Sequence, residues 1–312
     1  MKVKYTWIPF AIAILLIIPM RLQQLITTDG YILGVPITDN IKVSHIIFAV
    51  IFLFIAILIF MSFISKDVPD RVEIEKNKLL AFLVLINSCL ILFSGIQYLI
   101  MLFGGTDVNY IKYFILFLAS VLASIAMFGM ACSFYDGFDR FKKMPAYILL
   151  PVVWATVRVV VLFIDNTSVA CSYVEMFDLL SESLITLFLF IQAKSFEDIK
   201  GNNLGKKLFA YGLPAIVFSI AFNVPVLCQK IVRIPDNVSG YTIDNLIDIS
   251  IAIYIAVFLI SVTIKCNKNI VAQHIERRKN ISRFKGMASS FANEKEEEKS
   301  KAVEDSMLRK NK

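Results

Sequence analysis

Eight apolar stretches, each about 20 residues long, run through this 312-residue chain. A helix rises about 1.5 Å per residue, so roughly 20 apolar residues cross the ~30 Å hydrocarbon core of a bilayer. Only 18% of the residues are charged and 57% are hydrophobic, which excludes an ordinary soluble domain. The sequence therefore predicts an all-α polytopic transmembrane bundle of about eight helices, near residues 5–26, 45–65, 79–104, 111–134, 146–164, 173–193, 207–228 and 245–264.

Lys and Arg residues are unevenly divided between alternate loops. The loops on the side of the N-terminus hold 13 of them, and the loops on the other side hold 5. Basic loops stay in the cytoplasm, so we expect a multi-pass protein of the plasma (cytoplasmic) membrane with both termini in the cytoplasm. The first apolar run ends in Pro19, Met20 and Arg21 without a small-residue cleavage site, which favours an uncleaved helix over a signal peptide.

Three parts of the chain are distinguished by composition. Residues 1–265 are expected to form the transmembrane bundle. Residues 266–286 interleave basic and apolar side chains, which is typical of an amphipathic juxtamembrane segment that binds anionic inner-leaflet lipids. Residues 287–312 are charged and predicted to be a disordered cytoplasmic tail. The net charge of +7 is concentrated on the cytoplasmic side and gives no support to nucleic-acid binding.

A single arginine, Arg158, lies inside the fifth apolar stretch, PVVWATVRVVVLFID. A guanidinium keeps its proton, so it needs an anion or water within the membrane. On the next stretch Glu175, Asp178 and Glu182 follow one face of a helix. Their depth predicts that Asp178 or Glu182 pairs with Arg158, either as a structural ion pair or as part of a ligand site.

Other polar residues are predicted at the same depth, toward the outer side of the membrane. Such groups are costly against lipid, so they should converge on the bundle interior or on a water-filled vestibule. The outer half and outer loops carry ten acids and six bases. Asp244 and Asp248 are four residues apart near a helix N-terminus, where the helix dipole favours acids in any case. The predicted ligand-binding or coupling residues are Arg158, Glu182, Asp178, Arg21, Gln97, Asn223 and Asp248, with Glu182 the deepest acid.

Several classes of site are excluded by residue types that are scarce or wrongly spaced. The five Cys residues form no C-x-x-C pair and the two His residues lie on opposite sides of the predicted membrane, so we expect no metal and no cofactor. No G-x-S-x-G, H-E-x-x-H or Walker A motif occurs, and no catalytic residue is predicted. Cys171 and Cys228 both fall at the predicted outer surface, where a disulfide between them is compatible with the compartment.

The segment IPMRLQQLITTDGY, residues 18–31, holds an early P-x-R-x-x-Q-L motif followed by an acid and a Gly-aromatic pair. This motif resembles a pattern in a family of uncharacterised multi-pass bacterial membrane proteins. The resemblance implies a defined role for Arg21, and it places Gln24, Asp29, Gly30 and Tyr31 at family positions. It implies no particular activity.

Three functions fit these observations. The first is a carrier or sensor that binds a small cationic or zwitterionic solute in an outward-facing polar vestibule, because the outer side is acidic. The second is a non-catalytic scaffold or subunit of a membrane or envelope complex, in which the polar layer only holds helices together. The third is an intramembrane enzyme that uses Asp178 and Glu182 as paired carboxyl groups. We favour the first, and its solute and protein partners are not identified by the sequence.

Overall fold

The computed structural model describes residues 3–27, 41–65, 68, 72, 74–104, 110–138, 146–167, 173–197, 203–232 and 243–266. Within these ranges it describes only the backbone of residues 24–27, 41–45, 166, 167, 173–176 and 229–232. The described residues are helical apart from short connections. The elements are η1 (Val3–Thr6), α1 (Trp7–Thr27), α2 (Ile41–Ile64), α3 (Lys78–Gly104), α4 (Tyr110–Asp136), α5 (Ala146–Thr167), α6 (Tyr173–Phe196), α7 (Leu204–Val232) and a last helix, Ile243–Cys266.

Eight helices of the described chain are long and apolar enough to cross a membrane, as the sequence predicts. The ends of these spans differ from the predicted ends by no more than four residues. The confirmed fold class is an all-α polytopic bundle, and the placement of both termini in the cytoplasm stays a prediction. α7 continues through both of its prolines, Pro214 and Pro225, so this span is one helix rather than two half-helices.

The chain divides into two compact units, Met1–Thr263 and Ile264–Lys312. The first unit contains α1 to α7 and most of the last helix. In the second unit the structure describes only Ile264 to Cys266. The predicted juxtamembrane segment and charged tail therefore lie outside the described residues.

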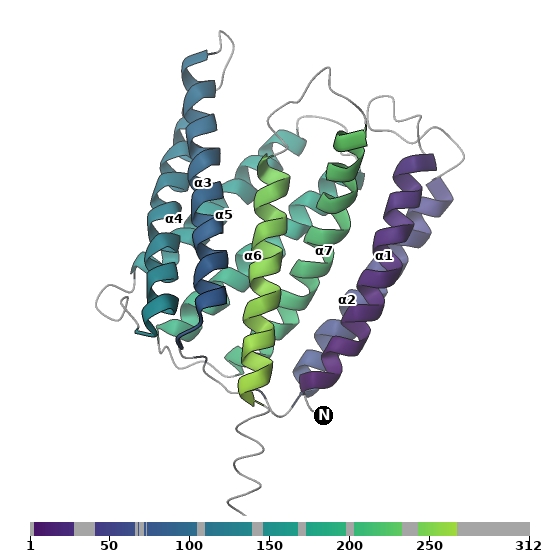
Figure 1. The fold of residues 1–312 in the computed structure, drawn as a ribbon. Helices are drawn as coiled ribbons and strands as arrows, with labels where there is room; N and C mark the ends of the chain where they lie inside the picture. The colour runs from purple at the N-terminus through teal and green to yellow at the C-terminus, as the bar shows by residue number, and fades with distance from the viewer. Residues whose placement is uncertain are drawn as a thin grey trace, which may run out of the picture. The chain divides into compact units, whose positions relative to one another are not determined.

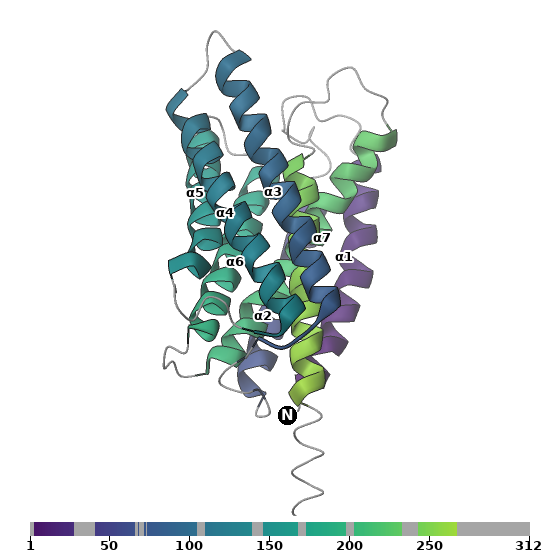
Figure 2. The same ribbon diagram turned by 60° about the vertical axis from the view of Figure 1, so that its left-hand side comes forward.

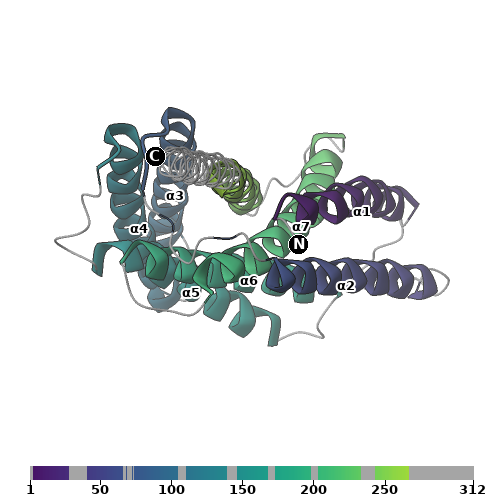
Figure 3. The ribbon, with the colours of Figure 1, turned by 90° about the horizontal axis from the view of Figure 1, so that it is seen from below.

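Most consecutive helices pack together within the first unit. α1 packs against α2, and in the series α3, α4, α5, α6, α7 each helix contacts the one that follows it. α7 also contacts α1 and α2 and so helps to hold this pair to the bundle (Figures 1 and 3). This arrangement puts the ends of α3, α5 and α7 at the same end of the bundle as the starts of α4 and α6 (Figure 1).

Small residues allow α3 and α4 to approach closely along much of their length (Figure 2). The Ser88 hydroxyl donates to the carbonyl of Ser124 at 2.9 Å, and the Ser124 hydroxyl donates to the carbonyl of Ser88 at 3.0 Å. About two turns further along α3, a Cβ atom added to Gly95 would lie 3.1 Å from Cβ of Ser120. In lipid, where apolar burial does not drive association, close packing and interhelical hydrogen bonds of this kind hold helices together.

The last helix contacts many of the other helices. Its Thr263 hydroxyl accepts a 3.1 Å hydrogen bond from the indole of Trp7 on α1. Its Tyr254 hydroxyl accepts from the Gln192 side chain of α6 and donates to the Met130 sulfur of α4 at 3.8 Å. The fully or nearly fully buried side chains of this helix are Ile247, Ile251, Ala252, Tyr254, Ile255, Phe258 and Leu259.

Gly212 of α7 sits where α6 and the last helix come closest to it. A Cβ atom there would lie 2.9 Å from Leu259 Cδ1 and 2.9 Å from Phe188 Cδ2. We predict that Gly212→Ala lowers the free energy of unfolding by about 1–3 kcal/mol, because the extra methyl group overpacks this junction. Gly104→Ala is the control, since nothing lies within 4 Å of its added Cβ. Thermal unfolding in detergent measures both, and equal midpoints for the two variants would contradict this packing.

Candidate functional site

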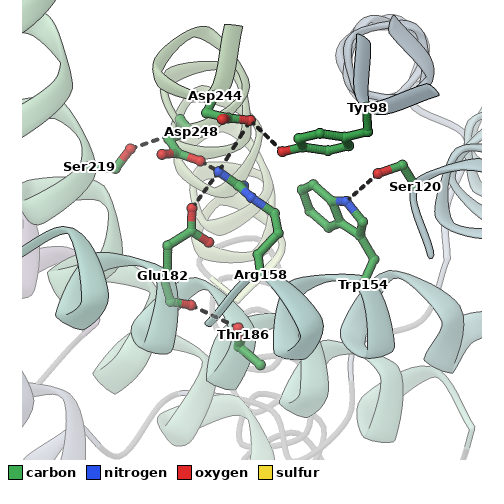
Figure 4. A network of polar contacts seen from close by, with 9 residues as sticks. All are labelled: Tyr98, Ser120, Trp154, Arg158, Glu182, Thr186, Ser219, Asp244 and Asp248. Carbon is green, nitrogen blue, oxygen red and sulfur yellow. Dashed lines mark hydrogen bonds and ion pairs between the residues drawn. The ribbon is translucent and has the colours of Figure 1, made fainter. Parts of the chain in front are cut away.

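The Arg158 guanidinium lies among three carboxylates from two other helices (Figure 4). Its Nη2 atom is 2.7 Å from Oε1 of Glu182 on α6, and its Nη1 atom is 3.0 Å from Oδ1 of Asp248 on the last helix. A longer contact of 4.0 Å joins Nη2 to Oδ1 of Asp244, one helical turn before Asp248. One positive charge thus faces three acids.

These charges are shielded from solvent to different degrees. The side chains of Arg158, Glu182 and Asp248 are 10%, 5% and 11% exposed, whereas that of Asp244 is 28% exposed. The Arg158–Glu182 contact is an ion pair rather than a well-aligned hydrogen bond, while Arg158 donates a hydrogen bond to Asp248. Charges buried to this extent interact strongly because little water screens them.

Packing from α4 and α7 fixes the position of the network. The ring of Trp154, one turn before Arg158 on α5, lies under the guanidinium at 4.9 Å from its Cζ atom. The indole N–H of Trp154 donates to the Ser120 hydroxyl of α4 at 3.1 Å. On the other side, the Ser219 hydroxyl of α7 donates to the backbone carbonyl of Asp248 at 2.8 Å. The arginine is therefore held by a cation–π contact as well as by its acids.

Tyr98 of α3 extends the network toward solvent. Its hydroxyl donates to Oδ1 of Asp244 at 3.1 Å, and its ring centroid is 6.3 Å from that of Tyr113 on α4. Figure 4 shows the rings of Tyr98 and Trp154 on one side of Arg158 and Glu182 on the other. Asp244 is thus hydrogen-bonded to Tyr98, and its contact with Arg158 is the longest of the three.

A cavity of about 300 Å³ adjoins these groups at one end of the bundle; we call it the polar cavity. It lies where α3, α5 and α7 end, the end that the loop charges predict to be outer. Among the residues that the structure describes, five acids and two bases line it, so carboxylates are in formal excess by three. The lining residues are Gln97, Tyr98, Met101, Lys112, Tyr113, Leu116, Arg158, Val161, Leu162, Asp165, Asp178, Glu182, Asn223, Asp244, Asn245 and Asp248.

The two bases of the polar cavity both have acidic partners. Lys112 Nζ is 2.6 Å from Oδ2 of Asp165, and these side chains are 25% and 45% exposed. Arg158 is in contact with its three acids as described above. Asp178, one turn before Glu182 on α6, adds a further carboxylate to the same wall. Burying several acids around a single arginine is costly unless protons or a cationic ligand balance them.

Six of the seven residues that the sequence nominates as a site line the polar cavity. They are Arg158, Glu182, Asp178, Gln97, Asn223 and Asp248. Of the two acids predicted to pair with Arg158, Glu182 is in direct contact with it. Their proximity is a structural observation, and their role in binding or coupling stays a prediction.

Arg21, the seventh, is placed elsewhere. It is buried, and its Cζ atom lies 4.3 Å from the ring centroid of Phe222 on α7. The Phe222 ring stacks on Phe177 of α6 at 4.7 Å, and Phe177 stacks on Phe48 of α2 at 4.1 Å. Arg21 therefore lies at the end of a column of aromatic rings and is not one of the described residues that line the polar cavity. Hydropathy gives the depth of a residue but not the direction in which its helix face points.

The sequence does not single out Tyr98, and it nominates Asp248 but not Asp244 as a site residue. Both belong to the Arg158 network. The four-residue spacing of Asp244 and Asp248, which puts both on one helix face, was the signal for Asp244. The sequence held no comparable signal for Tyr98, because aromatic residues are common near the ends of membrane-spanning helices.

Two further sequence predictions lie outside the described residues. Cys228 is exposed on α7, but Cys171 is not described, so the disulfide between them stays a prediction. Asp29, Gly30 and Tyr31 of the family resemblance are likewise not described. Across the part of the chain that the structure describes, no group of three or more His, Cys, Asp and Glu side chains is arranged to hold a metal ion.

We predict that Arg158→Met lowers the free energy of unfolding by about 3–5 kcal/mol, because it leaves Glu182 and Asp248 as buried carboxylates without their cation. Lys112→Met is the matched control, since it removes a base of the same cavity from a more exposed pair and should cost less than about 1 kcal/mol. Denaturant or thermal unfolding in detergent checks both. A cost for Arg158→Met no greater than for Lys112→Met would show that the buried network does not stabilise the fold.

Comparison with known proteins returns no relative: the chain matches no protein-family model, no curated protein and no solved structure. A function for this chain can therefore be argued only from its own residues and their geometry.

Proposed function

We propose that this protein is a carrier or sensor that binds a small cationic or zwitterionic solute in the polar cavity. The observation that carries the proposal is the excess of acid over base in that cavity, with five carboxylates against two basic groups. A cavity with low-dielectric walls and one sign of charge concentrates solutes of the opposite sign. Its volume of about 300 Å³ is at the lower end of the range for small-molecule sites.

The depth of the cavity supports binding of a solute over attraction of ions to a surface. Glu182 and Asp248 lie at its inner wall and are almost fully buried, while Asp165 and Asp244 are more exposed. A solute that enters would meet carboxylates at successive depths. Charged groups held inside a membrane protein in this way commonly mark the path of a substrate or an ion.

A scaffold is the second candidate, and the Arg158 network is the observation that favours it. The network joins α5, α6 and the last helix, and Tyr98 adds α3. Such a cluster serves as a structural tie whether or not a solute binds. An enzyme with Asp178 and Glu182 as paired carboxyl groups is less well supported, because Glu182 is engaged by Arg158.

We predict that binding of the solute requires the acids of the cavity. The purified protein is screened by thermal shift against ions, amines, amino acids and nucleosides, and a bound solute at about 100 times its dissociation constant adds roughly 2.7 kcal/mol of stability. Glu182→Gln and Asp178→Asn should each weaken binding about tenfold or more, or roughly 1.4 kcal/mol. Asp136→Asn, an exposed acid at the opposite end of α4, should leave binding unchanged.

The same screen separates the carrier or sensor from the scaffold. If no solute in the panel raises the midpoint of the wild-type protein, the proposal fails and the scaffold is favoured. The double variant Arg158→Glu with Glu182→Arg should regain the stability that either single variant loses, whether the protein is a scaffold or a carrier or sensor. It should restore function only for a scaffold, because a solute site depends on where each charge lies.

We propose that the protein lies in the plasma membrane with both termini in the cytoplasm. The polar cavity then opens to the outer side of the membrane. The unequal division of Lys and Arg between the loops supports this orientation. The basic residues 266–286 are proposed to bind anionic lipid of the inner leaflet.

We predict that green fluorescent protein fused after Lys312 fluoresces and that alkaline phosphatase fused there is inactive, because the first is active in the cytoplasm and the second outside it. Fusions within the loop at residues 105–109 should behave in the opposite way. Activity of the phosphatase at the C-terminus would reverse the orientation.

A further inference from the structure

Resting on the proposed function, we infer that the solute is an organic amine without a carboxylate group, and not a zwitterion. A ligand of the polar cavity can pair with its acids more readily than with its bases. Of the cations and zwitterions proposed above, this favours compounds that carry an ammonium group on an apolar or aromatic body.

A zwitterion needs a positive partner for its carboxylate, and the two bases that line the polar cavity are already engaged. Arg158 directs its two terminal nitrogens at Glu182 and Asp248, at 2.7 and 3.0 Å. Lys112 is 2.6 Å from Asp165. A ligand carboxylate would have to displace one of these acids and would then lie among the others, where like charges repel at short range.

An ammonium group, unlike a carboxylate, has an accessible partner of opposite charge in Asp244. This acid is the most exposed of the three around Arg158, and its contact with Nη2 is the longest of them, at 4.0 Å. The Tyr98 hydroxyl donates to it at 3.1 Å, and the Tyr98 ring lines the same cavity. A carboxylate and an aromatic ring in one cavity suit an organic ammonium ion, which can pair with the acid and contact the ring by a cation–π attraction.

The remaining wall of the cavity suits an apolar body. Tyr113 lies beside Tyr98, with ring centroids 6.3 Å apart. The apolar side chains that line the same cavity are Met101, Leu116, Val161 and Leu162. At roughly 30 Å³ for each water-sized group, the volume of about 300 Å³ accepts a molecule of about ten such groups. An arylethylamine or a branched alkylamine has this size.

The test compares amines with the amino acids from which they differ by one carboxylate. The full-length protein in detergent is titrated calorimetrically with phenethylamine and with phenylalanine, and then with isoamylamine and with leucine. We expect each amine to bind about tenfold more tightly than its amino acid, because both bases among the described lining residues are already paired with acids. Equal or tighter binding of the amino acids would overturn the inference and leave the proposed function standing.

Variants locate the amine. Asp244→Asn and Tyr98→Leu should each weaken phenethylamine binding about tenfold, whereas Tyr98→Phe, which keeps the ring, should weaken it less. Tyr135→Leu, an exposed tyrosine at the opposite end of α4, is the control and should have no effect. Each variant is compared with the wild type by its unfolding midpoint. If folded variants bind phenethylamine as the wild type does, the amine lies elsewhere and the inference is wrong.

The outcome for the panel of solutes distinguishes the two proposals. Binding of inorganic cations alone, with no amine bound, would overturn the inference while the cationic site remains. Absence of binding by every amine, amino acid and inorganic cation would remove the proposed function together with the inference.

Discussion

Arg158 keeps its positive charge inside the bundle, and the helices around it are arranged to bring carboxylates to that charge. A guanidinium keeps its proton even in hydrocarbon, so the fold must bring anions to it. Glu182 and Asp248 do so from α6 and from the last helix, at 2.7 and 3.0 Å. The rotation of both helices about their axes is thereby fixed, because turning either one would leave a buried charge without a partner.

Much of the fold was accessible from the sequence because it depends on length and depth. A span must be about 20 residues long to cross hydrocarbon, so apolar runs predict the eight helices and their ends to within a few residues. Depth also brought Arg158 and Glu182 to the same level. The direction of each side chain was not accessible, because helices that face lipid on one side and protein on the other are apolar all round. Arg21 shows the consequence, since it stacks on Phe222 and does not enter the polar cavity.

The protein fixes its structure in two different ways on the two sides of the last helix. α3 and α4 approach through serines and a glycine, where short side chains and reciprocal hydrogen bonds hold the backbones together. α2, α6 and α7 instead meet through stacked phenylalanines that fill wider gaps. The first interface resists any added atom, while the second depends on large rings being present. The polar cavity is lined by residues of α3 and α4 from the first region and of α6 and α7 from the second.

The order of synthesis gives the last helix a particular part in assembly. The chain is made from its N-terminus, so Arg158 is made before the acids that surround it. Glu182 follows 24 residues later on the next helix, and the pair allows α5 and α6 to enter the bilayer as a hairpin in which the charge of Arg158 is already balanced. Asp244 and Asp248 arrive only with the final span. A chain truncated before residue 243 would therefore carry the arginine and Glu182 but lack the two carboxylates that the last helix brings to it.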